Sequence, residues 1–106
     1  MDRKKYLVGE LGQFIKKLSD EFSIQKIILF GSRATNNFKK ESDVDLIIVS
    51  KDFKGMDFFE RGAKMYDYWD IDLPVDFICY TPYEFNNLKK KISIVREALS
   101  NGIIVK

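Results

Sequence analysis

Three aspartates beside strongly apolar runs could do chemistry together. Asp43 and Asp45 head the run "DVDLIIVS", and Asp76 stands near the start of "PVDFICY". Aspartate is depleted in strands, and a buried carboxylate is costly unless something pairs with it. A solvated strand end, a structural ion pair and a metal site each explain such residues, and these positions alone leave all three open.

The spacing of the aspartates favours a metal site if two strands are neighbours. Alternate residues of a strand point to one face, so Asp43 and Asp45 share a face, with Cα atoms about 6–7 Å apart. If the strand that carries Asp76 lies alongside, three carboxylates converge and repel one another. A divalent cation removes that conflict, and magnesium prefers carboxylates together with substrate phosphates. Asp43, Asp45 and Asp76 are therefore the candidate catalytic residues and metal ligands.

A Gly-Ser pair precedes this region and adds a second kind of chemistry. Gly31 and Ser32 end the apolar run "KIILF". Glycine permits close backbone approach, and a serine hydroxyl with nearby N–H groups can hold a phosphate. A phosphate cradle beside carboxylates suits phosphoryl or nucleotidyl transfer with two metals. A Gly-Ser pair alone is usually only a turn, so the hypothesis depends on the joint order of the motifs.

The hydrophobic pattern predicts the elements that must position these motifs. Apolar residues three and four apart predict an amphipathic helix over 3–22. Further elements follow from apolar runs and their Gly and Pro boundaries: strands over 26–31, 43–50, 73–81 and 103–106, and helices over 55–70 and 82–100. The inner face of the 55–70 helix is assigned to Phe59, Ala63, Tyr66 and Trp69.

These elements predict one α/β (α+β) domain over residues 1–106, in which helices flank a small mixed sheet. The chain has no histidine, which excludes imidazole-based triads and histidine-ligated zinc. Its single cysteine, Cys79, excludes an internal disulfide and is expected in the core. A net charge of +2 gives no support for nucleic-acid or membrane binding. Without a signal-peptide core, the chain is expected to be cytoplasmic.

At this point the motifs together resemble a known family. The segments "LFGSRA" (29–34), "SDVDLIIV" (42–49), "VDFICYTPYEF" (75–85) and "VREALSNGIIVK" (95–106) resemble minimal nucleotidyltransferases, the MNT group of the DNA polymerase beta superfamily. The resemblance implies the polymerase-beta-like nucleotidyltransferase fold, with element order α-β-α-β-α-β-α. These proteins are commonly encoded beside a HEPN-domain toxin, for which they act as the antitoxin.

The resemblance also implies a role for each motif residue. Gly31 and Ser32 would hold the nucleotide's phosphates, and Asp43 and Asp45 would bind both magnesium ions. Asp76 would complete the second metal site and help to deprotonate the attacking hydroxyl. Arg33 could reach a phosphate, and a structural ion pair explains it equally well. The chain departs from many relatives by having Thr35-Asn36 where they have Arg-Gly.

The activity that the resemblance implies is transfer of AMP from ATP to a hydroxyl, with release of pyrophosphate. The acceptor would be a tyrosine of a partner HEPN toxin. Two alternatives stay open, namely a non-catalytic nucleotide-binding antitoxin and an enzyme with a small acceptor such as an aminoglycoside. In a single domain of 106 residues, we expect the acceptor side to come from a partner or from a second copy of the chain.

Overall fold

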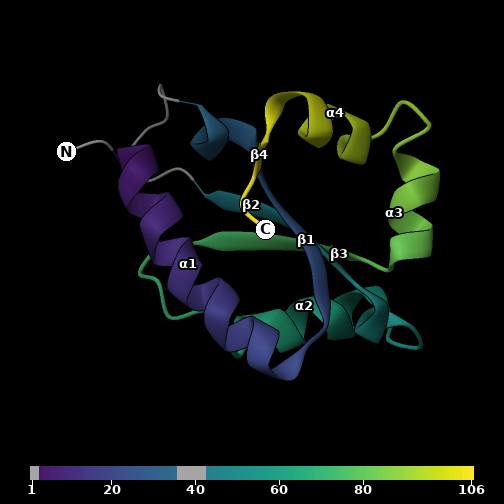
Figure 1. The fold of residues 1–106 in the computed structure, drawn as a ribbon, viewed down its shortest axis with the longest axis horizontal. Coiled ribbons are helices and arrows are strands. Elements are labelled where there is room, and N and C mark those ends of the chain that lie inside the picture. The colour runs from purple at the N-terminus through teal and green to yellow at the C-terminus, as the bar shows by residue number, and fades with distance from the viewer. Residues whose placement is uncertain (1–2, 36–42) are drawn as a thin grey trace.

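The computed structural model describes residues 3–35 and 43–106, which form a four-stranded sheet with helices on both faces (Figure 1). The sheet has the order β3-β2-β1-β4 and consists of β1 (Ile24–Phe30), β2 (Val44–Ser50), β3 (Val75–Tyr80) and β4 (Ile103–Ile104). β1 is antiparallel to β2 and β4, whereas β3 is parallel to β2. This mixed sheet confirms the predicted fold class.

One face of the sheet is covered by α1 (Arg3–Glu21) and α2 (Phe58–Tyr66). The predicted period of α1 is confirmed, because its buried residues recur three and four apart: Leu7, Leu11, Phe14 and Leu18. They pack in one cluster with alternate residues of the strands, among them Leu29, Leu46 and Phe77. Trp69, just beyond α2, joins this core with its ring centroid 5.1 Å from that of Phe14.

The opposite face is covered by α3 (Pro82–Leu88) and α4 (Ile94–Asn101), which Figure 1 shows in green and yellow at the upper right. The intervening strand residues, including Ile28 and Ile47, pack there against Phe85 and Val95. No helix in the described part of the chain combines the length and the apolar character needed to cross a membrane.

The predicted helix over 82–100 is wrong as one element, because the chain bends between α3 and α4. The Ser93 hydroxyl donates to Leu88 O (2.6 Å) and accepts from Arg96 N (3.2 Å), so it ties the end of α3 to the first turn of α4. This use of a serine as a cap favours a new helix start over continuation. A single helix over 82–100 would place Ile92 on one apolar stripe with Phe85, Leu88, Val95 and Leu99, but Ile92 is 97% exposed.

The predicted inner face of the 55–70 helix is wrong at Phe59, Ala63 and Tyr66, which are exposed, and is confirmed only at Trp69. Arg61 and Met65 are the buried residues of this helix, whereas Phe59 is 84% exposed and Tyr66 is 51% exposed. The helix begins later than predicted, with Asp57 as its N-cap. Arg61 takes an inward position because its guanidinium donates to Glu84 and to the carbonyl of Cys79. A charged residue with such partners can replace an apolar one at a buried position.

Cys79 lies on β3 and is 1% exposed, as expected for a core residue. Burial raises the pKa of its thiol to about 12. The thiolate is the reactive form of cysteine, so this side chain is chemically inert at neutral pH.

Candidate active site

The strand pairing brings the three sequence motifs to one end of the sheet. β1 ends at Phe30, beside the start of β2, because the two strands are antiparallel and Phe30 pairs with Asp45. β3 runs parallel to β2, so its start lies at the same end, and Asp45 pairs with Asp76. The short 3₁₀ helix η1 (Gly31–Ala34) follows β1 directly. The Gly-Ser pair and two of the aspartates therefore meet at this end.

Asp45 and Asp76 point to the same face of the sheet. The residues on either side of Asp45, Val44 and Leu46, are buried in the cluster under α1 and α2. The residues flanking Asp76 belong to the same cluster, and strand side chains alternate between faces. Both aspartates therefore point to the face that α3 and α4 cover, on adjacent strands about 4.8 Å apart.

The electrostatics of Asp45 identify it as the central carboxylate. Burial raises the pKa of Asp45, and the negative charges of Asp76 and Asp43 raise it further. Asp43 directly precedes β2 and is exposed, as is Asp76, whereas Asp45 is half-buried. The charges of both other aspartates thus act on Asp45, which is paired with Asp76 and lies two residues after Asp43.

Gly31 makes close contact with this carboxylate possible. Its φ of +71° lies in the left-handed region, and a Cβ at this position would lie 2.4 Å from Asp45 Oδ2. Any other residue would be strained in its backbone and would overlap Asp45. The glycine of the Gly-Ser motif is therefore required both by the turn out of β1 and by the aspartate beside it.

Two neighbouring residues of η1 differ in exposure, because Ser32 is exposed and Arg33 is buried. Ser32 is exposed, and its carbonyl accepts from both the backbone N–H (3.1 Å) and the hydroxyl (2.7 Å) of Thr35, which closes the turn. Arg33 is 3% exposed, which favours the structural alternative over contact with a phosphate. Thr35, the first residue of the Thr35-Asn36 departure, thus closes η1, while Asn36 lies outside the described residues.

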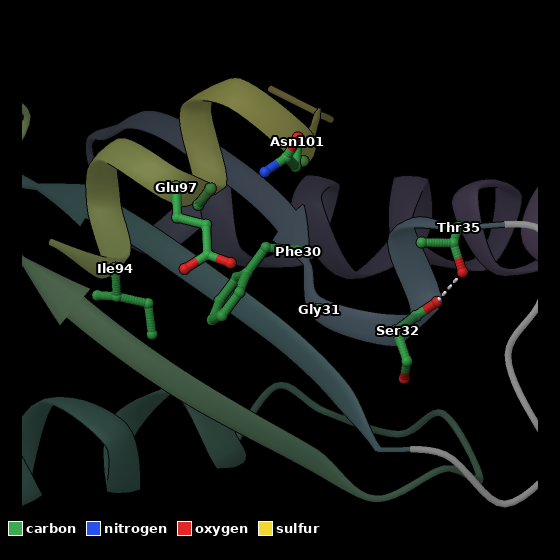
Figure 2. A pocket seen from close by; sticks show the side chains of 9 residues that line it. Phe30, Gly31, Ser32, Thr35, Ile94, Glu97 and Asn101 are labelled. Atoms are coloured by element: carbon green, nitrogen blue, oxygen red, sulfur yellow. Dashed lines mark hydrogen bonds between the residues drawn. The ribbon is translucent and has the colours of Figure 1, made fainter. Parts of the chain in front are cut away.

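A pocket of about 430 Å³ opens beside Gly31 and Ser32, between η1 and α4 (Figure 2). Phe30 and Ile94 contribute apolar surface to it, and Glu97 and Asn101 contribute polar groups. The sequence hypothesis named none of these four residues. Glu97 and Asn101 are four apart and so share a face of α4, but no sequence signal placed that face beside the Gly-Ser motif.

The carboxylates fit magnesium in their chemistry. Oxygen donors are what this ion prefers, and a cation would relieve the repulsion that raises the pKa of Asp45. Within residues 3–35 and 43–106, no three acidic or thiol side chains are already close enough together to form a ready metal cluster. Ligation by Asp43, Asp45 and Asp76 therefore stays a prediction.

Comparison with known proteins gives one family match and matches of the fold to solved structures. Residues 11–102 match the family described as Nucleotidyltransferase domain. The fold resembles a crystal structure of a candidate nucleotidyltransferase from Sulfolobus solfataricus, with a TM-score of 0.68, 20% identity, and coverage of 95% of this chain and 80% of that one. It also resembles BolA1 from Arabidopsis thaliana, with a TM-score of 0.54, 23% identity, and coverage of 69% and 92%. No curated protein sequence matches significantly.

Proposed function

The match over residues 11–102 shows that this chain belongs to the nucleotidyltransferase domain family, and we propose that it transfers AMP from ATP to a hydroxyl group. Pyrophosphate is released in this reaction. The observation that carries the proposal is the contact geometry of Gly31, Asp45 and Asp76. The Gly-Ser turn lies against Asp45, and Asp45 is paired in register with Asp76. Phosphate-binding and acidic groups are thereby adjacent, as nucleotidyl transfer requires.

In the proposed reaction, the acceptor oxygen attacks the α-phosphorus of ATP. A new oxygen–phosphorus bond forms, the bond from the α-phosphorus to the bridging oxygen breaks, and pyrophosphate leaves. The proton of the acceptor hydroxyl passes to the Asp76 carboxylate. Ser32 is exposed, and in the proposed reaction its hydroxyl donates to a phosphate oxygen. Magnesium held by Asp43, Asp45 and Asp76 would supply the positive charge that stabilises the transferring phosphoryl group.

The position of Asp76 leaves room for an acceptor carried by another molecule. Asp76 is exposed and lies on β3, which is the last strand at one side of the sheet. In the proposal, the acceptor hydroxyl reaches Asp76 at this edge strand. We include in the proposal the acceptor suggested by the sequence resemblance, a tyrosine of a HEPN-domain partner.

The test uses ATP labelled at the α-phosphate, magnesium, and the protein encoded beside this chain. We expect the label to enter the partner, whereas ATP labelled at the γ-phosphate should leave it unlabelled. Asp45→Asn should reduce transfer by at least about 10³-fold, because it removes a charge that the transition state requires. Asp20→Asn, an exposed aspartate on α1 near the other end of β1, is the matched control. An active Asp45→Asn protein would refute the carboxylate site.

A further inference from the structure

The pocket between η1 and α4 continues directly from the row of carboxylates. Residues that pair across neighbouring strands point to the same face, so Asp76, Asp45 and Phe30 form one row across β3, β2 and β1. Phe30 is the member of that row that lines the pocket. A molecule whose phosphates lie at the carboxylates and Ser32 therefore has a cavity immediately beyond them.

The surface of this pocket suits an uncharged ring better than a phosphate. Phe30, Ile94 and Ala98 give it apolar walls. The side chain of Glu97 reaches from α4 towards Phe30, and Asn101 follows one turn later (Figure 2). A carboxylate repels a polyphosphate but accepts hydrogen bonds from an amine, and an amide can both donate and accept.

The walls of the pocket are fixed by the fold. β4 pairs with β1 through Ile28–Ile104 and Leu29–Ile103, which holds the end of α4 against β1. At Gly102 an added Cβ would lie 2.5 Å from Ala98 O and 2.8 Å from Leu29 O, so only glycine permits this close approach. The volume of about 430 Å³ is within the range of small-molecule sites.

We propose that this pocket binds the base of the donor nucleotide, and that Glu97 selects bases carrying an exocyclic amine, such as adenine. Phe30 and Ile94 contact the ring, and Asn101 pairs with a ring nitrogen. This inference rests on the proposed function, since it concerns the same nucleotide. It adds a determinant of base specificity to a site whose other residues contact only phosphates and the reacting oxygen atoms.

The first test compares binding of three ligands in the presence of magnesium: ATP, purine riboside triphosphate, which lacks only the exocyclic amine, and tripolyphosphate. We expect ATP to bind about tenfold more tightly than purine riboside triphosphate, the size of effect typical of a hydrogen bond to a charged group. Glu97→Gln should reduce this preference several-fold without weakening the binding of tripolyphosphate. Glu60→Gln, an exposed glutamate on α2, should alter neither quantity.

The second test locates the base by amide NMR shifts. The differences between the ATP-bound and tripolyphosphate-bound spectra should concentrate at Phe30 and α4. Differences centred instead on the separate hollow beside Met56, Phe58 and Arg61 would overturn the inference. Equal affinities for ATP and tripolyphosphate would also overturn it while leaving the proposed transfer intact. Failure of the wild type to bind any of the three ligands would overturn the proposed function and the inference together.

Discussion

The two ends of β3 carry opposite electrostatic arrangements. At its start, Asp76 lies beside Asp45, and their like charges help to raise the pKa of Asp45. Just beyond its end, Glu84 accepts from Arg61 at 2.6 Å, and this hydrogen bond lowers the pKa of Glu84. The first arrangement makes the ionised native state less stable, whereas the second stabilises it.

The difference distinguishes a candidate active site at the start of β3 from a structural ion pair just beyond its end. Arg61 donates hydrogen bonds to several residues, since it also donates to Met56 O (3.0 Å) and Cys79 O (3.1 Å). It links α2, β3 and the start of α3 in one network. The aspartates, by contrast, place negative charges side by side on adjacent strands. A bound cation or a proton would relieve their repulsion. Strain of this kind at a sheet end is typical of functional positions.

Within β3, the largest effect is expected at Asp76. Asp76→Asn should leave the affinity for magnesium–ATP largely intact and slow single-turnover transfer about 10²–10⁴-fold, because it removes the proton acceptor. A loss confined to the transition state lowers the rate equally at low and saturating ATP. Asp72→Asn, an exposed aspartate in the preceding loop, is the control. Wild-type turnover in Asp76→Asn would assign Asp76 to a solvated strand start, and loss of ATP binding would place it in the triphosphate site.

The supporting end of β3 should respond in stability. Arg61→Met removes the guanidinium from Glu84 and from the Cys79 carbonyl, although Glu84 still accepts from the Thr81 N–H. We expect a loss of about 2–3 kcal/mol in the free energy of unfolding by urea. This is less than for a fully buried pair because the Glu84 side chain keeps 41% exposure. Lys64→Met, exposed on the same helix, should change stability by less than about 0.5 kcal/mol. Equal effects of the two substitutions would show that the ion pair does not support the fold.

Substitution of Gly31 tests whether its close contact with Asp45 limits the residue type at this position. Gly31→Ala should cost about 2 kcal/mol, part from its left-handed φ and part from overlap with Asp45. Gly55→Ala isolates the first part, because Gly55 has a φ of +86° and no atom within 4 Å of an added Cβ; about 1 kcal/mol is expected. Combining Gly31→Ala with Asp45→Ala should remove the excess over Gly55→Ala. Additive losses in this double-mutant cycle would contradict the contact.

The same contrast explains what the sequence could and could not predict. The meeting of Gly31-Ser32 with the Asp-x-Asp motif could be predicted because each motif is local and directly adjoins a strand, whereas the roles of these residues stay predictions. The inner face of α2 could not, because Arg61 is buried through a partner 23 residues away. The pocket was missed for a similar reason. Its α4 wall is positioned by the pairing of β4 with β1, which no local pattern specifies.

The smallest predicted effect is a pH dependence of opposite sign at the two ends of β3. The pKa of native Asp45 is raised above its unfolded value of about 3.9, so its ionised form destabilises the fold at neutral pH. As pH falls through the native pKa, Asp45 binds its proton and this penalty disappears. Without divalent cations, Asp45→Asn should therefore be more stable than wild type at neutral pH, by at most about 1 kcal/mol, and lose that advantage in acid.

Glu84 should behave in the reverse way. Its native pKa is lowered, so its contribution is fully present above the unfolded value of about 4.3 and is lost as pH falls through the native pKa. Glu84→Gln should therefore be less stable than wild type at neutral pH, with a deficit that shrinks only in stronger acid. Urea unfolding of wild type, Asp45→Asn and Glu84→Gln over this pH range measures both differences. If the two variants deviate from wild type in the same direction at neutral pH, the electrostatic contrast between the two ends of β3 is wrong.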